Sequence, residues 1–123
     1  SQNFLHDAHY IERIVAAVDP RPGDRVLEIG PGLAAISAPL LARAQHLTCI
    51  EIDRDLAARL RERFTPEQLT LIEADALTID WRALAEQDLR PLRIVGNLPY
   101  HISTPILFAL LPIADRVRDQ HFM

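Results

Sequence analysis

The amino-acid sequence predicts an α/β fold built on a doubly wound, mostly parallel β-sheet. Short apolar runs alternate along the chain with segments whose apolar residues recur at helical spacing. Glycines or polar side chains follow directly after each of the first four runs, which is where open parallel sheets bind their ligands. The alternation implies parallel pairing of the strands, and the polar strand ends predict a ligand site at the carboxyl edge of the sheet.

The predicted strands cover residues 25–29, 47–52, 69–74, 92–96 and the segment from Val117 onward. The predicted helices cover residues 10–18, 34–44, 54–64, 81–87 and 104–111. Pro39 fits its helix only within the first turn, where its missing N–H has no intrahelical partner.

Size and composition indicate one ordinary globular unit. Of its 123 residues, 49% are hydrophobic and 24% are charged, so the chain can bury a single core. A net charge of −4 gives no overall basic surface for nucleic acid, although all thirteen basic residues are arginine. A single cysteine excludes an internal disulfide framework. Since no stretch resembles a signal peptide or a membrane span, we expect a cytoplasmic protein without a membrane partner.

The last predicted strand, from Val117, has no helix after it to cover it. An uncovered terminal strand presents an edge that is prone to aggregation. We therefore expect residues 1–123 to be part of a larger domain.

The segment Glu28-Ile29-Gly30-Pro31-Gly32 joins a predicted strand to a predicted helix. Glycines there let the backbone approach a ligand closely and leave helix N–H groups to bind it. Glu51 ends the next strand, where a carboxylate accepts hydrogen bonds from the ribose of nicotinamide or methionine cofactors. The alternatives are a tight turn without a ligand and an acidic strand end exposed to solvent.

Further polar residues follow the next strand ends. Asp75 can accept a hydrogen bond from an adenine amine, although aspartate is also a common turn residue. Asp53 or Asp55 is better explained as a helix N-cap. The histidines have no metal-ligand spacing, so no metal is expected, and Cys49 lies within a predicted strand and is expected in the core.

Asn97-Leu98-Pro99-Tyr100 is the most specific motif, and its chemistry fits an adenine amine. The Asn97 side-chain oxygen and the Leu98 carbonyl can each accept one amine hydrogen, which frees the nitrogen lone pair for attack. Pro99 would fix the backbone, and Tyr100 would stack on the base, a contact worth roughly 1–3 kcal/mol. The alternative is a polar loop whose proline ends a strand and whose tyrosine fills the core.

With these motifs in this order, the chain resembles the ribosomal RNA adenine dimethyltransferases, whose relatives include the macrolide-resistance RNA methylases. Four segments carry the resemblance, at residues 28–32, 51–53, 75–77 and 97–105. It implies a Rossmann-like, class I S-adenosylmethionine-dependent methyltransferase fold over residues 1–123, truncated after the start of strand five. The remaining strands and a C-terminal helical RNA-binding domain would lie outside these residues.

The resemblance also implies a set of cofactor-binding residues: Asn3, Leu5, Gly30, Glu51, Asp75 and Asn97. In this scheme Asn3 and Leu5 contact the methionine part of S-adenosylmethionine, and Asn97 lies between the methyl donor and the acceptor base. Ala34 departs from the family pattern, because another glycine is usual at its position. His101 and Ser1 also depart from the pattern, at positions where asparagine and glycine are common.

By the same resemblance, the whole protein would dimethylate N6 of two adjacent adenosines near the 3′ end of small-subunit ribosomal RNA. It would act on the pre-30S particle as a monomer, in ribosome biogenesis, and release S-adenosylhomocysteine. The 123-residue chain alone is expected to bind cofactor but to show weak or no catalysis.

Three other functions are compatible with parts of the sequence. A nicotinamide-dependent dehydrogenase shares the glycine turn and Glu51 but leaves residues 97–100 unexplained. The other two are a non-catalytic RNA-binding assembly factor and an adenine methyltransferase that acts on DNA or on large-subunit RNA.

Overall fold

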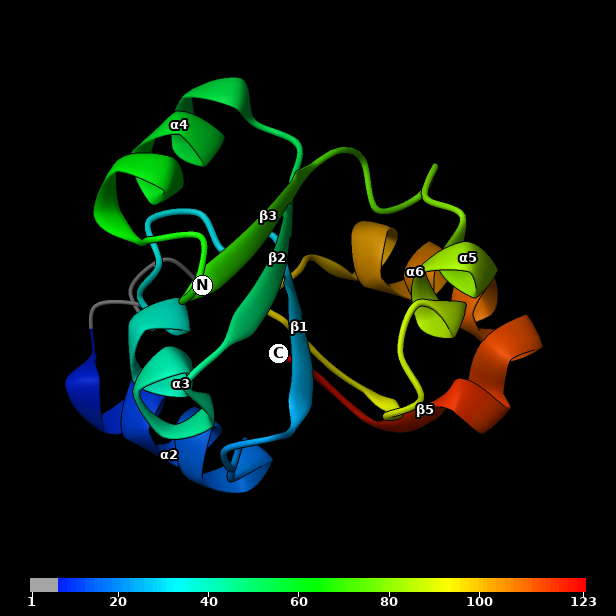
Figure 1. The fold of residues 1–123 in the computed structure, drawn as a ribbon, viewed down its shortest axis with the longest axis horizontal. Coiled ribbons are helices and arrows are strands. Elements are labelled where there is room, and N and C mark those ends of the chain that lie inside the picture. The colour runs from blue at the N-terminus through cyan, green and yellow to red at the C-terminus, as the bar shows by residue number, and fades with distance from the viewer. Residues whose placement is uncertain (1–6) are drawn as a thin grey trace.

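A five-stranded, entirely parallel sheet forms the centre of the molecule, in a computed structural model that describes residues 7–123. The strands lie in the order β3-β2-β1-β4-β5, as Figure 1 shows. Their bounds are β1 Arg25–Ile29, β2 Leu47–Glu51, β3 Leu69–Glu73, β4 Leu92–Gly96 and β5 Val117–Phe122. All five predicted strands are confirmed, and the order reverses at β1, as in a doubly wound fold.

Helices cover both faces of this sheet (Figure 1). On one side lie α2 (Ala8–Val18), α3 (Ser37–Ala44) and α4 (Arg54–Arg63), and on the other lie α5 (Trp81–Glu86), α6 (Tyr100–Leu110) and the 3₁₀ helix η1 (Leu111–Arg116). Each face has its own hydrophobic cluster: α2 and α3 pack with Val26 and Cys49, while α5 and α6 pack with Leu27 and Ile94. Burial on both faces explains why the central strands are mostly apolar, with Glu28 and Arg93 as buried charged exceptions.

Aspartate side chains begin three of the helices. Asp7 caps α2, Asp53 caps α4 and Asp80 caps α5, each by accepting hydrogen bonds from backbone N–H groups of the first turn. The prediction that Asp53 or Asp55 serves as an N-cap is therefore confirmed for Asp53.

Two predicted helix starts are wrong. Helix α3 begins at Ser37 rather than Ala34, because Ala34 has a φ of 70°, which no α-helix contains. Pro39 consequently lies in the first turn, where a proline is tolerated. Helix α6 begins at Tyr100 rather than Thr104, because Pro99 ends the loop and its carbonyl accepts hydrogen bonds from Ile102 and Ser103.

Arg93, in the central strand β4, ties three elements together. Its guanidinium donates to Asp24 at 2.9 Å, to both carboxylate oxygens of Asp119 at 2.9 and 2.7 Å, and to the Val18 carbonyl at the end of α2. The Arg93 side chain is only 6% exposed. The hydrogen bond from Arg93 holds the pKa of the Asp119 carboxyl below its usual range, so this pair remains ionised at neutral pH.

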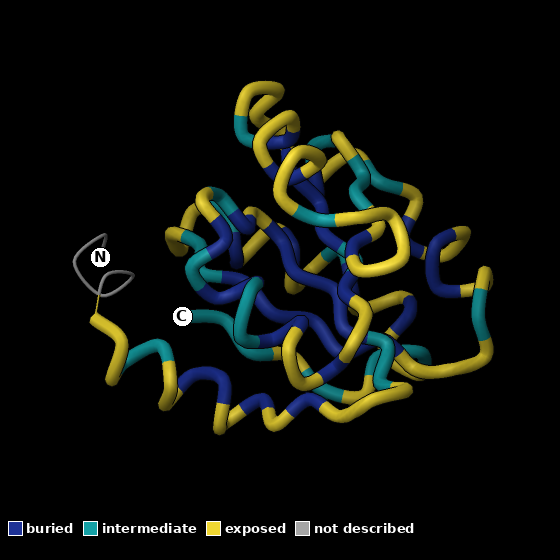
Figure 2. Tube along the Cα trace, turned by 60° about the vertical axis from the view of Figure 1, so that its left-hand side comes forward, coloured by how far each residue is buried: buried dark blue, intermediate teal, exposed yellow. Residues whose placement is uncertain are grey.

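The sheet ends at β5, whose residues are half-buried or exposed (Figure 2). Its side chains alternate in exposure, whereas every residue of the neighbouring strand β4 is buried. Within residues 7–123, no helix is long and apolar enough to cross a lipid bilayer.

Replacing Arg93 by methionine should lower the free energy of unfolding by about 3 kcal/mol, because two partly buried carboxylates would lose their nearest cation. Arg61→Met is the matched control. Arg61 pairs with Glu73 but is 54% exposed, so its loss should cost less than about 1 kcal/mol. Urea unfolding of the purified chain measures the loss of unfolding free energy in both variants. Equal losses would show that Arg93 stabilises the fold no more than an exposed ion pair does.

Candidate functional site

The carboxyl ends of β1, β2 and β4 open onto a cavity of about 840 Å³. This volume lies within the range of small-molecule pockets in proteins. Gly30 and Asn97 line it, together with Glu28, Asp53 and Arg59. Two of the residues predicted for the site are therefore brought to one cavity, from strands that are neighbours in the sheet.

The loop after β1 owes its shape to three residues with positive φ. Gly30, Gly32 and Ala34 have φ values of 68°, 58° and 70°, and a non-glycine residue in this region costs roughly 1–2 kcal/mol. The Ala34 N–H donates to the Pro31 carbonyl at 2.9 Å, and the Ala34 side chain is 1% exposed. Ala34 thus keeps a glycine-like backbone and places its methyl group in the core.

Glu51 holds this loop against the end of β2. One carboxylate oxygen accepts from the Gly32 N–H and the other from the Asp53 N–H, both at 3.0 Å. Glu51 is 4% exposed, so the alternative of a solvated strand end is wrong. Each oxygen has a second lone pair, which leaves the carboxylate able to accept a further hydrogen bond from a ligand hydroxyl.

Glu28 is a candidate site residue that the sequence analysis quoted but did not assign. It is 3% exposed, lines the cavity and accepts a short hydrogen bond from the Ser37 hydroxyl. Burial raises the pKa of the Glu28 carboxyl to about 7; the Ser37 hydrogen bond opposes this shift and the nearby charge of Glu51 adds to it. A charged residue within the otherwise apolar run 26–29 was the available sequence signal.

Asp75 follows β3 and forms the turn that the sequence left as an alternative. Its Oδ1 accepts from the Leu77 N–H at 2.9 Å, and its backbone carbonyl accepts from Thr78. Asp75 does not line the 840 Å³ cavity. Within the described part of the chain Oδ2 accepts no hydrogen bond, so the turn occupies only one of the two carboxylate oxygens.

Exposed apolar side chains follow the acidic strand ends. Ile52, directly after Glu51, is 65% exposed, and Leu77, two residues after Asp75, is 43% exposed. Both lie at the carboxyl edge of neighbouring strands. Neither side chain was predicted to belong to the site, although both stand close to the two carboxylates in the sequence.

Residues 97–100 lead from β4 into α6. Asn97 lines the cavity, and its side chain forms no hydrogen bond with the rest of residues 7–123. Leu98 is half-buried against the cluster under α6, and Pro99 precedes the first helical residue. Tyr100 is 89% exposed, so the alternative that it fills the core is wrong.

The remaining sequence predictions have mixed outcomes. Asn3 and Leu5 lie outside the described residues. Cys49 is fully buried, as expected for a core residue, and burial raises the pKa of its thiol. Trp81 packs in the core, and His101 lies in the first turn of α6. Among residues 7–123, no three metal-ligating side chains gather at one place.

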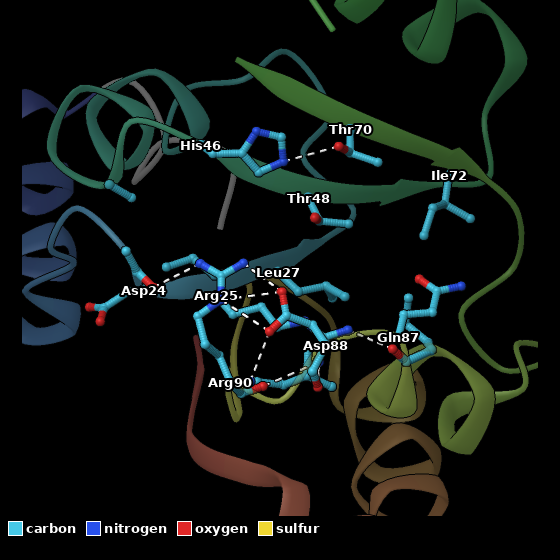
Figure 3. Close-up of a pocket in the computed structure, with 15 residues that line it drawn as sticks. Asp24, Arg25, Leu27, His46, Thr48, Thr70, Ile72, Gln87, Asp88 and Arg90 are labelled. Atoms are coloured by element: carbon cyan, nitrogen blue, oxygen red, sulfur yellow. Dashed lines mark hydrogen bonds and ion pairs between the residues drawn. The ribbon is translucent and has the colours of Figure 1, made fainter. Parts of the chain in front are cut away.

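A second cavity, of about 300 Å³, opens at the opposite, amino edge of the sheet (Figure 3). Its polar groups bond to one another: Thr70 contacts the His46 ring at 3.0 Å, and Arg25 donates to the Leu84 and Ala85 carbonyls at the end of α5. None of the predicted site residues lines it. We therefore regard this cavity as structural, with Arg25 satisfying the last carbonyls of a helix.

Comparison with known proteins identifies the family of the chain. The family model described as ribosomal RNA adenine dimethylase matches residues 1–123. The chain belongs to the ribosomal RNA adenine dimethylase family. In this member of the family, the cavity between the glycine loop and Asn97 lies at the carboxyl edge of the sheet.

Three relatives show how similar the chain is to individual proteins in sequence and in structure. The chain is 59% identical over 123 residues to the ribosomal RNA small subunit methyltransferase A of Acinetobacter baylyi, covering 99% of this chain and 44% of that protein. The crystal structure of the 23S rRNA methyltransferase ErmE has a TM-score of 0.69 at 34% identity, over 83% of this chain and 40% of that one. A dimethyladenosine transferase from Plasmodium falciparum has a TM-score of 0.70 at 27% identity, over 86% and 37%. The chain spans less than half the length of these relatives.

Glu28→Gln should change how stability depends on pH. The folded chain keeps the Glu28 proton up to about pH 7, whereas the unfolded chain loses it near the ordinary pKa of 4.5. Between these values folding takes up a proton, so Glu28 makes the folded state less stable as the pH rises through this window.

The glutamine variant lacks this penalty, and its advantage over the unsubstituted chain should grow between pH 4.5 and 7, to at most about 3 kcal/mol. Urea unfolding at several pH values measures the difference, with the exposed Glu62→Gln as control. A difference between Glu28→Gln and the unsubstituted chain that does not vary with pH would show that Glu28 is ionised in the folded protein.

Proposed function

We propose that this chain provides the cofactor-binding and amine-binding groups of an S-adenosylmethionine-dependent adenine-N6 dimethyltransferase that acts on small-subunit ribosomal RNA. One observation carries the proposal: the glycine loop and Asn97 line the same cavity, in a chain that belongs to the ribosomal RNA adenine dimethylase family. The 59% identity to a protein named ribosomal RNA small subunit methyltransferase A supports the choice of RNA.

The residues at the carboxyl edge fit the parts of S-adenosylmethionine. Gly30 and its loop suit the methionine carboxylate or amino group, and Glu51 suits the ribose hydroxyls. The unoccupied oxygen of Asp75 suits the adenine amine, and Ile52 and Leu77 are placed for apolar contact with the adenine ring. Asn3 and Leu5 would complete the methionine site. The cofactor would supply a methyl group already activated by the positive sulfonium.

Residues 97–100 would then hold the substrate. The Asn97 oxygen and the Leu98 carbonyl accept the two amine hydrogens and orient the nitrogen lone pair toward the methyl group. Tyr100, which is 89% exposed, is free to stack on an adenine that has left its helix. Positioning therefore supplies most of the catalysis, and no strong general base is needed because the amine proton becomes acidic after methylation.

A second candidate is methylation of large-subunit RNA, favoured by the similarity to the 23S rRNA methyltransferase ErmE. Its identity of 34% is well below the 59% to the small-subunit enzyme, so we favour small-subunit RNA. The nicotinamide-dependent dehydrogenase is disfavoured, because the family match and the Asn97 motif have no explanation in it.

The whole protein would act on two adjacent adenosines near the 3′ end of small-subunit RNA, in the cytoplasm, as a monomer on the pre-30S particle and without a metal. We assign RNA recognition mainly to the part of the relatives that this chain does not match. The net charge of −4 supports that assignment, since phosphate binding requires basic surface. The 123-residue chain would bind cofactor with weak or no methyl transfer of its own.

The 123-residue chain should bind S-adenosylhomocysteine in isothermal titration calorimetry and show no heat with NAD. Glu51→Gln should weaken binding about tenfold, because a charge-assisted hydrogen bond is worth roughly 1.5 kcal/mol. Glu73→Gln is the matched control, since Glu73 pairs with Glu51 in the sheet register but lies on the edge strand β3, where its side chain pairs with Arg61. Binding of NAD in place of the methionine cofactor would contradict the proposed function.

Asn97→Ala should reduce kcat for adenine methylation in the whole protein by a factor of about 100 or more, because one preorganised acceptor is lost. Cofactor affinity should change much less. The control is His101→Ala, an exposed residue of α6 close to the site. Single-turnover methyl transfer to small-subunit RNA measures the rate, and near-normal turnover of the Asn97 variant would rule out its catalytic role.

A further inference from the structure

The Leu98 side chain occupies a space that exists only because two neighbouring positions are glycine. A Cβ atom added to Gly30 would lie 3.1 Å from Leu98 Cδ2, and one added to Gly96 would lie 3.2 Å from Leu98 Cδ1 and 3.3 Å from Cγ. These separations are shorter than ordinary van der Waals contact. We call Gly30 and Gly96 the glycine socket of Leu98.

The socket spans the two strands that carry the site. Gly96 is the last residue of β4 and pairs with Ile29, the last residue of β1, directly before Gly30. One half of the socket thus belongs to the loop that we assign to the cofactor. The other half directly precedes Asn97, which we assign to the substrate amine.

The backbone of Leu98 is fixed as well. Its N–H donates to the Met123 carbonyl at 3.2 Å, and the Met123 N–H donates to the Gly96 carbonyl at 3.0 Å. The side chain also packs against the hydrophobic cluster under α6. With its backbone bonded to the residue after β5 and its side chain between two glycines, Leu98 has little freedom to move.

We infer that the Leu98 side chain, seated in the Gly30–Gly96 socket, is the positioning element that sets the amine acceptors of Asn97 and Leu98 at a fixed place relative to the cofactor loop. The inference rests on the proposed methyl transfer. It assigns to the Leu98 side chain and to Gly96 a role separate from that of the Leu98 carbonyl, which accepts the amine hydrogen.

Gly96 is the sharpest place to test this role. Its Cβ would also lie 3.3 Å from the Ile29 carbonyl, a backbone atom held in the sheet, so the side chain of Leu98 must yield instead. A shift of a few tenths of an ångström at Leu98 is passed on to its own carbonyl and to Asn97. Catalysis that depends on positioning is sensitive to displacements of this size, whereas binding of a cofactor spread over several strand ends is much less so.

The experiment is a double-mutant cycle in the whole protein with Gly96→Ala, Leu98→Ala and the double variant. Gly96→Ala should lower kcat about tenfold while the Kd for S-adenosylhomocysteine stays within about threefold. Leu98→Ala keeps the carbonyl but empties the socket, and it should also lower kcat. In the Leu98→Ala background the Gly96 substitution should have little further effect, because the side chain it would displace is gone.

Leu89→Ala, at a leucine that is 95% exposed, is the control for loss of a leucine side chain. Thermal unfolding of each variant separates lost positioning from lost folding. If Gly96→Ala fails to fold, the test rests on Leu98→Ala, which introduces no steric clash. A normal kcat in the Leu98→Ala variant would overturn the inference. Multiplicative effects of the two substitutions in an active protein would overturn the positioning role and leave the proposed function standing. Absence of methyl transfer by the unsubstituted protein would overturn both.

Discussion

The parallel pairing of β1 with β4 is the constraint on which the rest of the site depends. Their register sets Ile29 opposite Gly96, so the residues that follow, Gly30 and Asn97, emerge side by side at one edge of the sheet. The pairing of β1 with β2 brings the end of β2 to the same edge, where Glu51 bonds to the glycine loop. Gly30, Glu51 and Asn97 thus lie close together because their three strands end at the same edge of the sheet. A shift of one residue in the strand register would move them apart.

Arg93 and Glu28 lie on the same face of the central strands β4 and β1, at opposite ends. The charge of Arg93 is compensated by ion pairs, whereas that of Glu28 is reduced by protonation. Arg93, toward the amino end, is surrounded by Asp24, Asp119 and the last carbonyl of α2, and so remains a cation. Glu28, toward the carboxyl end, has the Ser37 hydroxyl as its hydrogen-bond partner, and burial favours its protonated form. The first arrangement stabilises the fold between elements, whereas the second leaves an acid of nearly neutral pKa beside the cavity.

The sequence predicted those features that depend on local pattern. Apolar runs located the first four strands, since buried strands need apolar side chains on both faces. It placed the start of α3 wrongly because alanine favours a helix locally, whereas the loop needs a left-handed Ala34 to pass around the end of β1. Glu28 had a signal in the sequence, because it is a charged residue within an apolar run. The socket under Leu98 had none, because a missing Cβ acquires meaning only when strands distant in sequence lie side by side.

The charge of the cavity separates the tasks of the site. Asp53 and Asp55 line it with Arg59, the basic residue among the lining side chains of the described chain, while burial favours the protonated form of Glu28. A cavity with this excess of aspartate would suit the cationic sulfonium of the proposed donor better than the uncharged thioether of its product, so methyl transfer would weaken the electrostatic attraction between the cavity and the cofactor. The same charge would repel the phosphates of the proposed RNA substrate. An unstacked base, neutral and aromatic, could then approach Asn97, while contacts with the RNA backbone would come from basic groups away from this edge.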